Sequence, residues 1–183
     1  WIDTETTGRS AHLNQIIEVA IAITDMDGNV LLEPRAVLVA IEPWSKNELE
    51  TIGIHGIDWR KPEFRRAAKS LREVIERVSA RIEGRRVAGH NVAFDVGFVK
   101  ASAERVGLPV RQELSAPTLD TMTLARSLMK RGLLAKQSAS LVALRERFGV
   151  GHTAHRAAGD VAATIEIYRR LRALETPALA VSA

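Results

Sequence analysis

The chain has 183 residues, a formal net charge of +4 at pH 7 and a sequence pI of about 9.8. This length suits one domain with a hydrophobic core, and the absence of cysteine excludes disulfides and thiolate metal sites. Any metal ligands are therefore carboxylates and histidines, a set that favours Mg²⁺ or Mn²⁺ over Zn²⁺. No apolar run reaches the ~18 residues of a membrane span, so we expect a cytoplasmic protein that does not contact membranes.

The opening segment is typical of a three-stranded β-meander. Residues 1–4 resemble the end of a strand, which leads us to expect further residues upstream in the natural protein. Residues 15–25 are a nearly continuous apolar run, and residues 29–41 are expected to return beside them after the Asp27-Gly28 turn. Pro34 cannot donate a backbone hydrogen bond, so the third strand is expected to begin at a sheet edge or a bulge.

The middle of the chain predicts helices that alternate with short strands. After a loop with about one helical turn, a single helix is expected from Pro62 to Gly84 because its apolar residues recur at helical spacing. Between residues 60 and 86 there are ten arginines or lysines against four glutamates. Such a stripe suits a polyanionic partner, and a solvated helix face explains it equally well. The elements expected next are a buried strand, a helix, a fifth strand and a second helix, at residues 86–89, 92–106, 118–121 and 121–129.

The last part of the chain is expected to be helical. A short helix follows from Ser140 to Phe148, with Gly149 as its cap, and an amphipathic helix ends near Leu174. Together these elements predict an α/β fold with a five-stranded mixed sheet and helices on both faces. We assign residues 1–174 to one domain, whose first strand is truncated at its N-terminus, and residues 175–183 to a C-terminal tail.

Four carboxylates and one histidine form the candidate site. Asp3 and Glu5 lie two residues apart in a strand, so their side chains point to the same side of the sheet and require a cation or a shared proton. Asp95 and Asp160 stand near the starts of two helices, and His155 precedes Asp160 by five residues. Four such carboxylates can bridge two divalent cations ~3.5–4 Å apart for phosphodiester cleavage. An imidazole, which titrates near pH ~6.5, can accept the proton of the attacking water.

Three segments that carry these residues resemble the exonuclease motifs of the DEDDh (DnaQ-like) 3′→5′ exonuclease superfamily. They are DTETTG at residues 3–8, HNVAFD at 90–95 and HRAAGD at 155–160. The closest resemblance is to the epsilon-type proofreading subunits of bacterial DNA polymerase III, and it extends over residues 1 to about 172. It implies a ribonuclease H-like fold and a two-metal mechanism with Mg²⁺ or Mn²⁺.

The resemblance also implies a function and its partners. The expected reaction is hydrolysis of single-stranded DNA 3′ ends to nucleoside 5′-monophosphates, in proofreading or repair. The expected partners are single-stranded nucleic acid 3′ ends, with DNA favoured over RNA, and a DNA polymerase. An RNA-trimming exonuclease of the same superfamily and a non-catalytic nucleic-acid-binding module are the alternatives. The second alternative is disfavoured because all five catalytic positions are filled.

Individual roles follow from the resemblance, position by position. Asp3 is expected to bridge both ions, Glu5 and Asp160 to hold the ion that activates water, and Asp95 to act through water. His155 is expected to be the general base, with His152 as its competitor. Ile57 is expected to wedge beside the last bases, within a substrate-binding set that comprises Thr6, Thr7, His55, Ile57, Asn91 and Phe94. We interpret four other residues as structural or core, namely Trp1, His12, Glu18 and Asp120. Trp44 and Trp59 could stack on bases, although tryptophans in loops more often cover the core.

Overall fold

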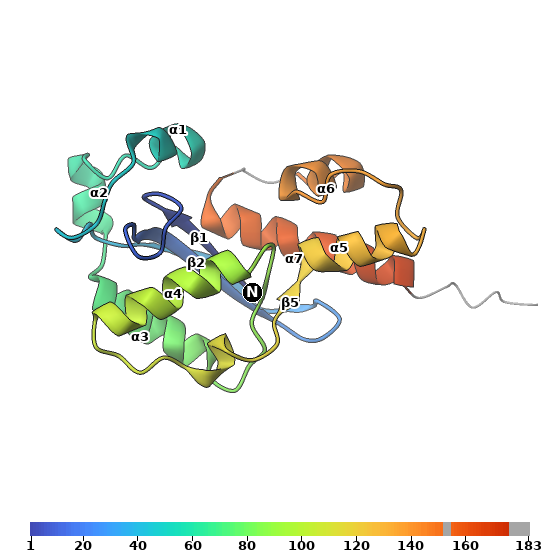
Figure 1. Cartoon of the computed structure of the whole chain (residues 1–183), viewed down its shortest axis with the longest axis horizontal. Coiled ribbons are helices and arrows are strands. Elements are labelled where there is room, and N and C mark those ends of the chain that lie inside the picture. The colour runs from blue at the N-terminus through green and yellow to red at the C-terminus, as the bar shows by residue number, and fades with distance from the viewer. Residues whose placement is uncertain (152–154, 176–183) are drawn as a thin grey trace, which may run out of the picture.

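A computed structural model describes residues 1–151 and 155–175. Most of the predicted tail, residues 176–183, lies outside the described residues. Figure 1 shows a central sheet with helices packed on its two sides, and the first residue lies near the middle of the molecule. Within the described ranges, no helix combines the length and the apolar composition that crossing a membrane requires.

Three antiparallel strands form the predicted β-meander, in the order β1-β2-β3. Gly28 adopts a left-handed φ of 88° in the turn between β2 and β3. The pairing register shifts where Ile21 faces Arg35 and Ile23 faces Leu32, so Pro34 lies in the irregular stretch, as predicted. The strands are β1 (Ile2–Thr6), β2 (Ile16–Thr24) and β3 (Val30–Leu38).

The other two strands, β4 (Ala88–Gly89) and β5 (Leu119–Asp120), pair with each other in parallel. The prediction of one five-stranded sheet is therefore corrected, because the described residues form a three-stranded and a two-stranded sheet. β4 nevertheless lies against β1, since a Cβ atom on Gly89 would come within 2.9 Å of the Ile2 carbonyl oxygen.

Both faces of the three-stranded sheet are covered by helices, as predicted (Figure 1). On one face Val19 packs in a cluster with α3 (Leu71–Ile82) and α4 (Ala93–Arg105). On the other face Ala20 and Ala22 pack against α7 (Ala157–Glu175). Successive strand residues point to opposite faces, and the small alanines allow the backbone of α7 to approach the sheet closely. The first turn of α7 is thereby held beside β1 and β2.

The single helix expected from Pro62 to Gly84 is instead two helices, α2 (Pro62–Ala67) and α3. The break occurs at Lys69, whose backbone N–H donates to Leu38 O at 2.9 Å and whose carbonyl accepts from Ala40 N at 2.8 Å. Ser70 then caps α3 by accepting a hydrogen bond from the backbone N–H of Glu73. The apolar spacing continues through the break, so periodicity alone misses it.

The remaining helices agree with the sequence-based expectations, except that the short 3-10 helix η2 was not predicted. The loop after β3 contains one helical turn, and Gly149 ends α6 with a left-handed φ of 62°. Helices α5, α6 and α7 share a second apolar cluster beside the sheet. These elements are η1 (Leu49–Thr51), α1 (Ile52–His55), η2 (Gln112–Leu114), α5 (Thr121–Lys130) and α6 (Leu141–Phe148).

Candidate active site

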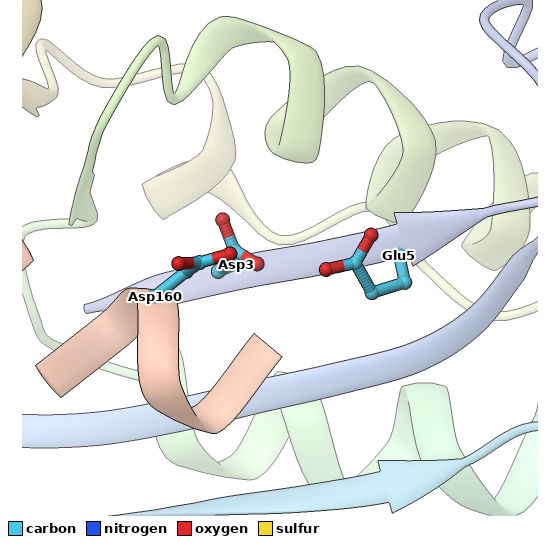
Figure 2. Close-up of side chains that lie close together, drawn as sticks. All are labelled: Asp3, Glu5 and Asp160. Atoms are coloured by element: carbon cyan, nitrogen blue, oxygen red, sulfur yellow. The ribbon is translucent and has the colours of Figure 1, made fainter. Parts of the chain in front are cut away.

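Three carboxylates converge where β1 meets the first turn of α7 (Figure 2). Along β1 the residues Ile2, Thr4 and Thr6 are buried, whereas Asp3 and Glu5 occupy the alternate, partly open positions. Asp160 projects from α7 toward the same place. One carboxylate oxygen from each of Asp3, Glu5 and Asp160 lies within 4.8 Å of the others. We call this group the acidic cluster.

Asp95 approaches the acidic cluster from α4. Its Oδ1 atom accepts a hydrogen bond of 2.7 Å from the hydroxyl of Thr4, which ties the first turn of α4 to β1. Asp95 is only 3% exposed, and its charge contributes to the raised pKa of Asp3. It is not one of the three residues whose oxygens meet within 4.8 Å. Asp95 therefore borders the acidic cluster as a separate, fully enclosed carboxylate.

Burial and mutual repulsion strongly disfavour the ionised state of these groups. Burial, followed by the charges of neighbouring carboxylates, raises the pKa of Asp3 well above its usual value. The same causes raise the pKa of Glu5 to about 7. Burial also raises the pKa of Asp95 to about 7, against the opposing effect of the Thr4 hydrogen bond. Carboxylate oxygens that are crowded and buried in this way are the donor set that hard divalent cations require.

Asp160 has an anchored side chain. Its Oδ1 atom lies 3.4 Å from Nη1 of Arg145 on α6, and its Oδ2 atom accepts a 3.0 Å hydrogen bond from the backbone N–H of His155. The charge of Asp160 is thus partly balanced by an arginine, which reduces the cost of holding it beside two other carboxylates.

His155 stands immediately ahead of α7, with an exposed side chain and a left-handed φ of 56°. This backbone conformation is uncommon for residues other than glycine, and histidine is among the residues that tolerate it best. The competing base, His152, lies outside the described residues. The turn at His155 places the imidazole on the surface, while the backbone of the same residue is bonded to Asp160.

The sequence-based interpretation left Glu18 as a structural residue and missed its link to the site. Glu18 is 1% exposed and lies opposite Glu5 in the β1–β2 register. Its carboxylate accepts hydrogen bonds from the guanidinium of Arg156 at 2.6 Å and from the backbone N–H of Ala157 at 2.9 Å. A glutamate within an otherwise apolar run was the available signal, because a buried carboxylate requires charged or hydrogen-bonding partners.

The predicted substrate-binding residues on the first strand and its loop are largely enclosed. Thr6 is buried and donates its hydroxyl to the Gly8 carbonyl at 2.6 Å. Thr7 is fully buried, and its hydroxyl donates to the Lys46 carbonyl at 2.9 Å while its backbone N–H donates to Gln15 O. The side chain of Thr7 therefore supports the loop, and its predicted contact with substrate stays a prediction.

The other predicted substrate-binding residues differ in accessibility. His55 is buried at the end of α1, where its Nδ1 accepts from Ile57 N at 3.0 Å and burial lowers its pKa. Asn91 is exposed with a φ of 57°, and its backbone N–H donates to Asp120 at 3.1 Å. Phe94 is half-buried, with its ring centroid 4.8 Å from that of Phe98.

Ile57, the residue expected to wedge beside the last bases, is buried, and its role beside the bases stays a prediction. Ile57 is 7% exposed and packs in the cluster of Ile17, Trp59 and Phe64, so it has almost no surface to place beside a base. Ile54, on the neighbouring helix α1, is 53% exposed. Motif position alone could not separate the two isoleucines, because their burial is decided by packing against β2.

The tryptophans and Asp120 have mostly structural surroundings. Trp59 is buried in a core cluster, which agrees with the core-covering alternative for this residue. Trp1 is half-buried against Tyr168, with ring centroids 5.1 Å apart. Trp44 is partly exposed and lies 4.1 Å from the guanidinium carbon of Arg105, a cation–π contact. Asp120 caps α5 by accepting hydrogen bonds from the backbone of its first turn.

The sequence is similar to parts of much longer proteins. It is 33% identical over 166 residues to the DNA polymerase III PolC-type protein of Streptococcus suis, covering 88% of this chain and 10% of the relative. It is 29% identical over 171 residues to that of Thermotoga petrophila, covering 92% of this chain and 11% of the relative. The chain thus spans about a tenth of the length of these curated relatives.

The fold is similar to that of solved exonuclease I structures. E. coli exonuclease I in complex with a dT13 oligonucleotide superimposes with a TM-score of 0.85 at 20% identity, covering 95% of this chain and 40% of that chain. Exonuclease I from Methylocaldum szegediense gives a TM-score of 0.84 at 23% identity, covering 94% and 40% of the two chains. These similarities confirm the predicted ribonuclease H-like exonuclease fold. Residues 1–168 match the sequence model of the RNase_T family, described as exonuclease, and the chain belongs to this exonuclease family.

Proposed function

We propose that residues 1–174 are a metal-dependent 3′→5′ exonuclease domain that acts on single-stranded DNA ends and releases nucleoside 5′-monophosphates. The observation that carries this proposal is the convergence of Asp3, Glu5 and Asp160 within 4.8 Å, with Asp95 enclosed beside them. Family membership supports the hydrolytic activity. The similarity to exonuclease I in complex with a dT13 oligonucleotide supports DNA as the substrate. The similarity to DNA polymerase III PolC-type proteins supports a polymerase setting, in proofreading or repair.

The acidic cluster fits two divalent cations, Mg²⁺ or Mn²⁺. Asp3, Glu5 and Asp160 would hold one ion, and Asp3 together with Asp95, whose charge contributes to the raised pKa of Asp3, would hold the second. Held there, such cations would supply neutralisation of the crowded carboxylates, a lower pKa for the attacking water and stabilisation of the leaving oxygen's charge. The raised pKa values of Asp3 and Glu5 indicate that, without cations, the site binds protons in their place.

His155 is the proposed general base. Its imidazole is exposed, whereas its backbone N–H is bonded to Asp160. The ring can therefore accept a proton while the backbone of His155 stays in place. The proton comes from the water that attacks phosphorus as the bond between phosphorus and the 3′ oxygen breaks. The freed nucleotide keeps its 5′ phosphate, and the shortened strand carries a new 3′ hydroxyl.

The substrate surface is proposed to lie between β1 and α1. Ile54 offers an exposed apolar side chain beside His55, and Thr6 shapes the backbone turn that follows the acidic cluster. Asn91 and Phe94 contribute from the start of α4. Apolar side chains can pack against bases without regard to sequence, which suits an enzyme that removes every nucleotide in turn.

The decisive experiment compares 5′-labelled single strands of DNA and RNA of equal sequence, incubated with the purified protein in Mn²⁺, Mg²⁺ or EDTA. We expect stepwise shortening of the DNA strand from its 3′ end with either metal and no shortening in EDTA. Asp3→Ala is the inactive control. Preferential shortening of RNA would contradict the DNA assignment, and strand binding without product would indicate a non-catalytic binding module.

A further inference from the structure

Glu18 makes a long-range connection between the middle of β2 and the turn that presents the proposed base. Its two oxygens receive the guanidinium of Arg156 at 2.6 and 3.2 Å and the backbone N–H of Ala157 at 2.9 Å. Arg156 directly follows His155, and Ala157 is the first residue of α7. One buried side chain therefore holds both residues that follow the imidazole.

The burial of Glu18 makes this connection strong. A carboxylate that is 1% exposed is costly unless it is paired and hydrogen-bonded. A guanidinium with two donors in a plane supplies such a partner in one geometry. The position of the Arg156 head group is accordingly fixed by the interior of the sheet, although the side chain is about half exposed.

The turn itself requires such support. His155 adopts a left-handed φ of 56°, a conformation that an isolated chain segment rarely populates. Asp160 holds the turn from the α7 side through the His155 N–H, and Glu18 holds it from the sheet side through Arg156 and Ala157. The turn is thus fixed at three successive residues, from two different elements.

We propose that Glu18, acting through Arg156, is a positioning residue that fixes the direction in which His155 meets the attacking water. The inference rests on the proposed function only in taking His155 as the base. Glu18 itself does not contact substrate. Glu18 is paired with Glu5 in the β1–β2 register, so the strand that bears two residues of the acidic cluster lies directly beside the strand that sets the place of the base.

Substitution of the pair tests this proposal. Glu18→Gln keeps the volume and an acceptor for Ala157 N–H but removes the charge. Arg156→Gln removes the guanidinium and leaves the buried Glu18 carboxylate without its cation, so the melting temperature of each variant is measured alongside its kinetics. Arg156→Lys keeps the positive charge but cannot make the planar pair of hydrogen bonds that the guanidinium makes to Glu18. The matched control is Glu166→Gln, which breaks the 2.8 Å ion pair with Arg170 on the outer face of the same helix.

We expect kcat to fall by about 10–100-fold in Glu18→Gln and Arg156→Gln, the range typical of partners that orient a site residue. KM and the Mn²⁺ dissociation constant, measured by calorimetry, should change by less than about threefold, because neither residue binds substrate or metal directly. Arg156→Lys should recover part of kcat, and the double variant should be no slower than the worse single variant. Glu166→Gln should match the wild type.

The outcomes separate the possible roles. Unchanged kcat in folded Glu18→Gln and Arg156→Gln, with only a lower melting temperature, would show a purely structural pair and overturn the proposal. Additive losses, or a rise in KM confined to the Arg156 variants, would show that Arg156 binds the strand by itself, and would also overturn it. If Glu18→Gln does not fold, the kcat of Arg156→Gln and Arg156→Lys decides alone. A wild-type protein without turnover would contradict the proposed function instead.

Discussion

The backbone N–H of His155 donates a 3.0 Å hydrogen bond to Oδ2 of Asp160. The proposed base and a member of the acidic cluster are therefore joined within one turn, although the imidazole itself is exposed. This arrangement combines a fixed backbone with a side chain that can turn toward water. It also means that a substitution of Asp160 alters the turn as well as the cluster, so other residues give cleaner tests.

Asp3→Asn should separate activity from stability. The change removes a carboxylate whose pKa is raised by burial and by its neighbours, so repulsion in the metal-free protein decreases. In EDTA we expect the free energy of unfolding to rise by on the order of 1 kcal/mol, while turnover with Mn²⁺ falls by more than about 100-fold, beyond the effect of an indirect partner. Urea unfolding and the strand assay measure the two effects. Asp27→Asn, at an exposed turn, is the control. A destabilised Asp3→Asn protein would contradict the repulsion.

The stability of the metal-free protein should depend on pH through Glu5. Its pKa rises from the usual 4.5 to about 7, so the folded state binds more protons than the unfolded state between these values. The contribution of Glu5 to stability is thus present below about pH 4.5 and is lost as pH rises to about 7. The melting temperatures of the wild type and Glu5→Gln, measured in EDTA, should become equal at low pH. At high pH the wild type should melt at the lower temperature. The opposite trend would refute the raised pKa.

His155→Asn should impair chemistry without loosening the fold. Asparagine tolerates the left-handed backbone at this position, and the side chain is exposed. We expect kcat to fall by about 10²–10⁴-fold, as for loss of a general base, with the melting temperature within about 2 °C of the wild type. His152→Ala serves as the comparison. A larger loss in His152→Ala than in His155→Asn would transfer the role of base to His152.

Ile54 and Ile57 should respond differently to truncation. Ile57→Ala removes a buried side chain and should cost about 2–5 kcal/mol of stability, because Ile57 packs against Trp59 and Phe64. Ile54→Ala removes exposed apolar surface and should leave the melting temperature nearly unchanged while raising KM for a single-stranded substrate. Thermal unfolding and steady-state kinetics of both variants provide the check. An unchanged KM in Ile54→Ala would exclude α1 from the substrate surface.

The basic residues of α2 should be tested by salt dependence. Arg65 and Arg66 are exposed on α2, whereas Arg77 on α3 is paired with Glu73 at 2.7 Å. If α2 contacts phosphates, Arg65→Gln and Arg66→Gln should each reduce the slope of log affinity against log salt by about 0.7, the value for one single-strand contact. Arg77→Gln should have little effect. Equal slopes in all variants would identify the stripe as solvated surface.

The sequence by itself determined the family, the order of strands and helices, and the residue types of the acidic cluster. Three short motifs carry this information because their occurrence in this order and at suitable separations is far more specific than any one of them alone. The β-meander, the bulge at Pro34 and the cap at Gly149 depend on local backbone chemistry, which is visible in a few neighbouring residues.

Only the tertiary structure decided which of these residues share an environment. The break at Lys69 depends on strand-like pairing with Leu38 and Ala40, the burial of Ile57 depends on β2, and the link from Glu18 to Arg156 joins residues 138 positions apart. The two-residue strands β4 and β5 likewise pair with each other rather than completing a single sheet. Burial and long-range hydrogen bonds depend on how distant segments pack, and the local periodicity of the sequence carries no information about that packing.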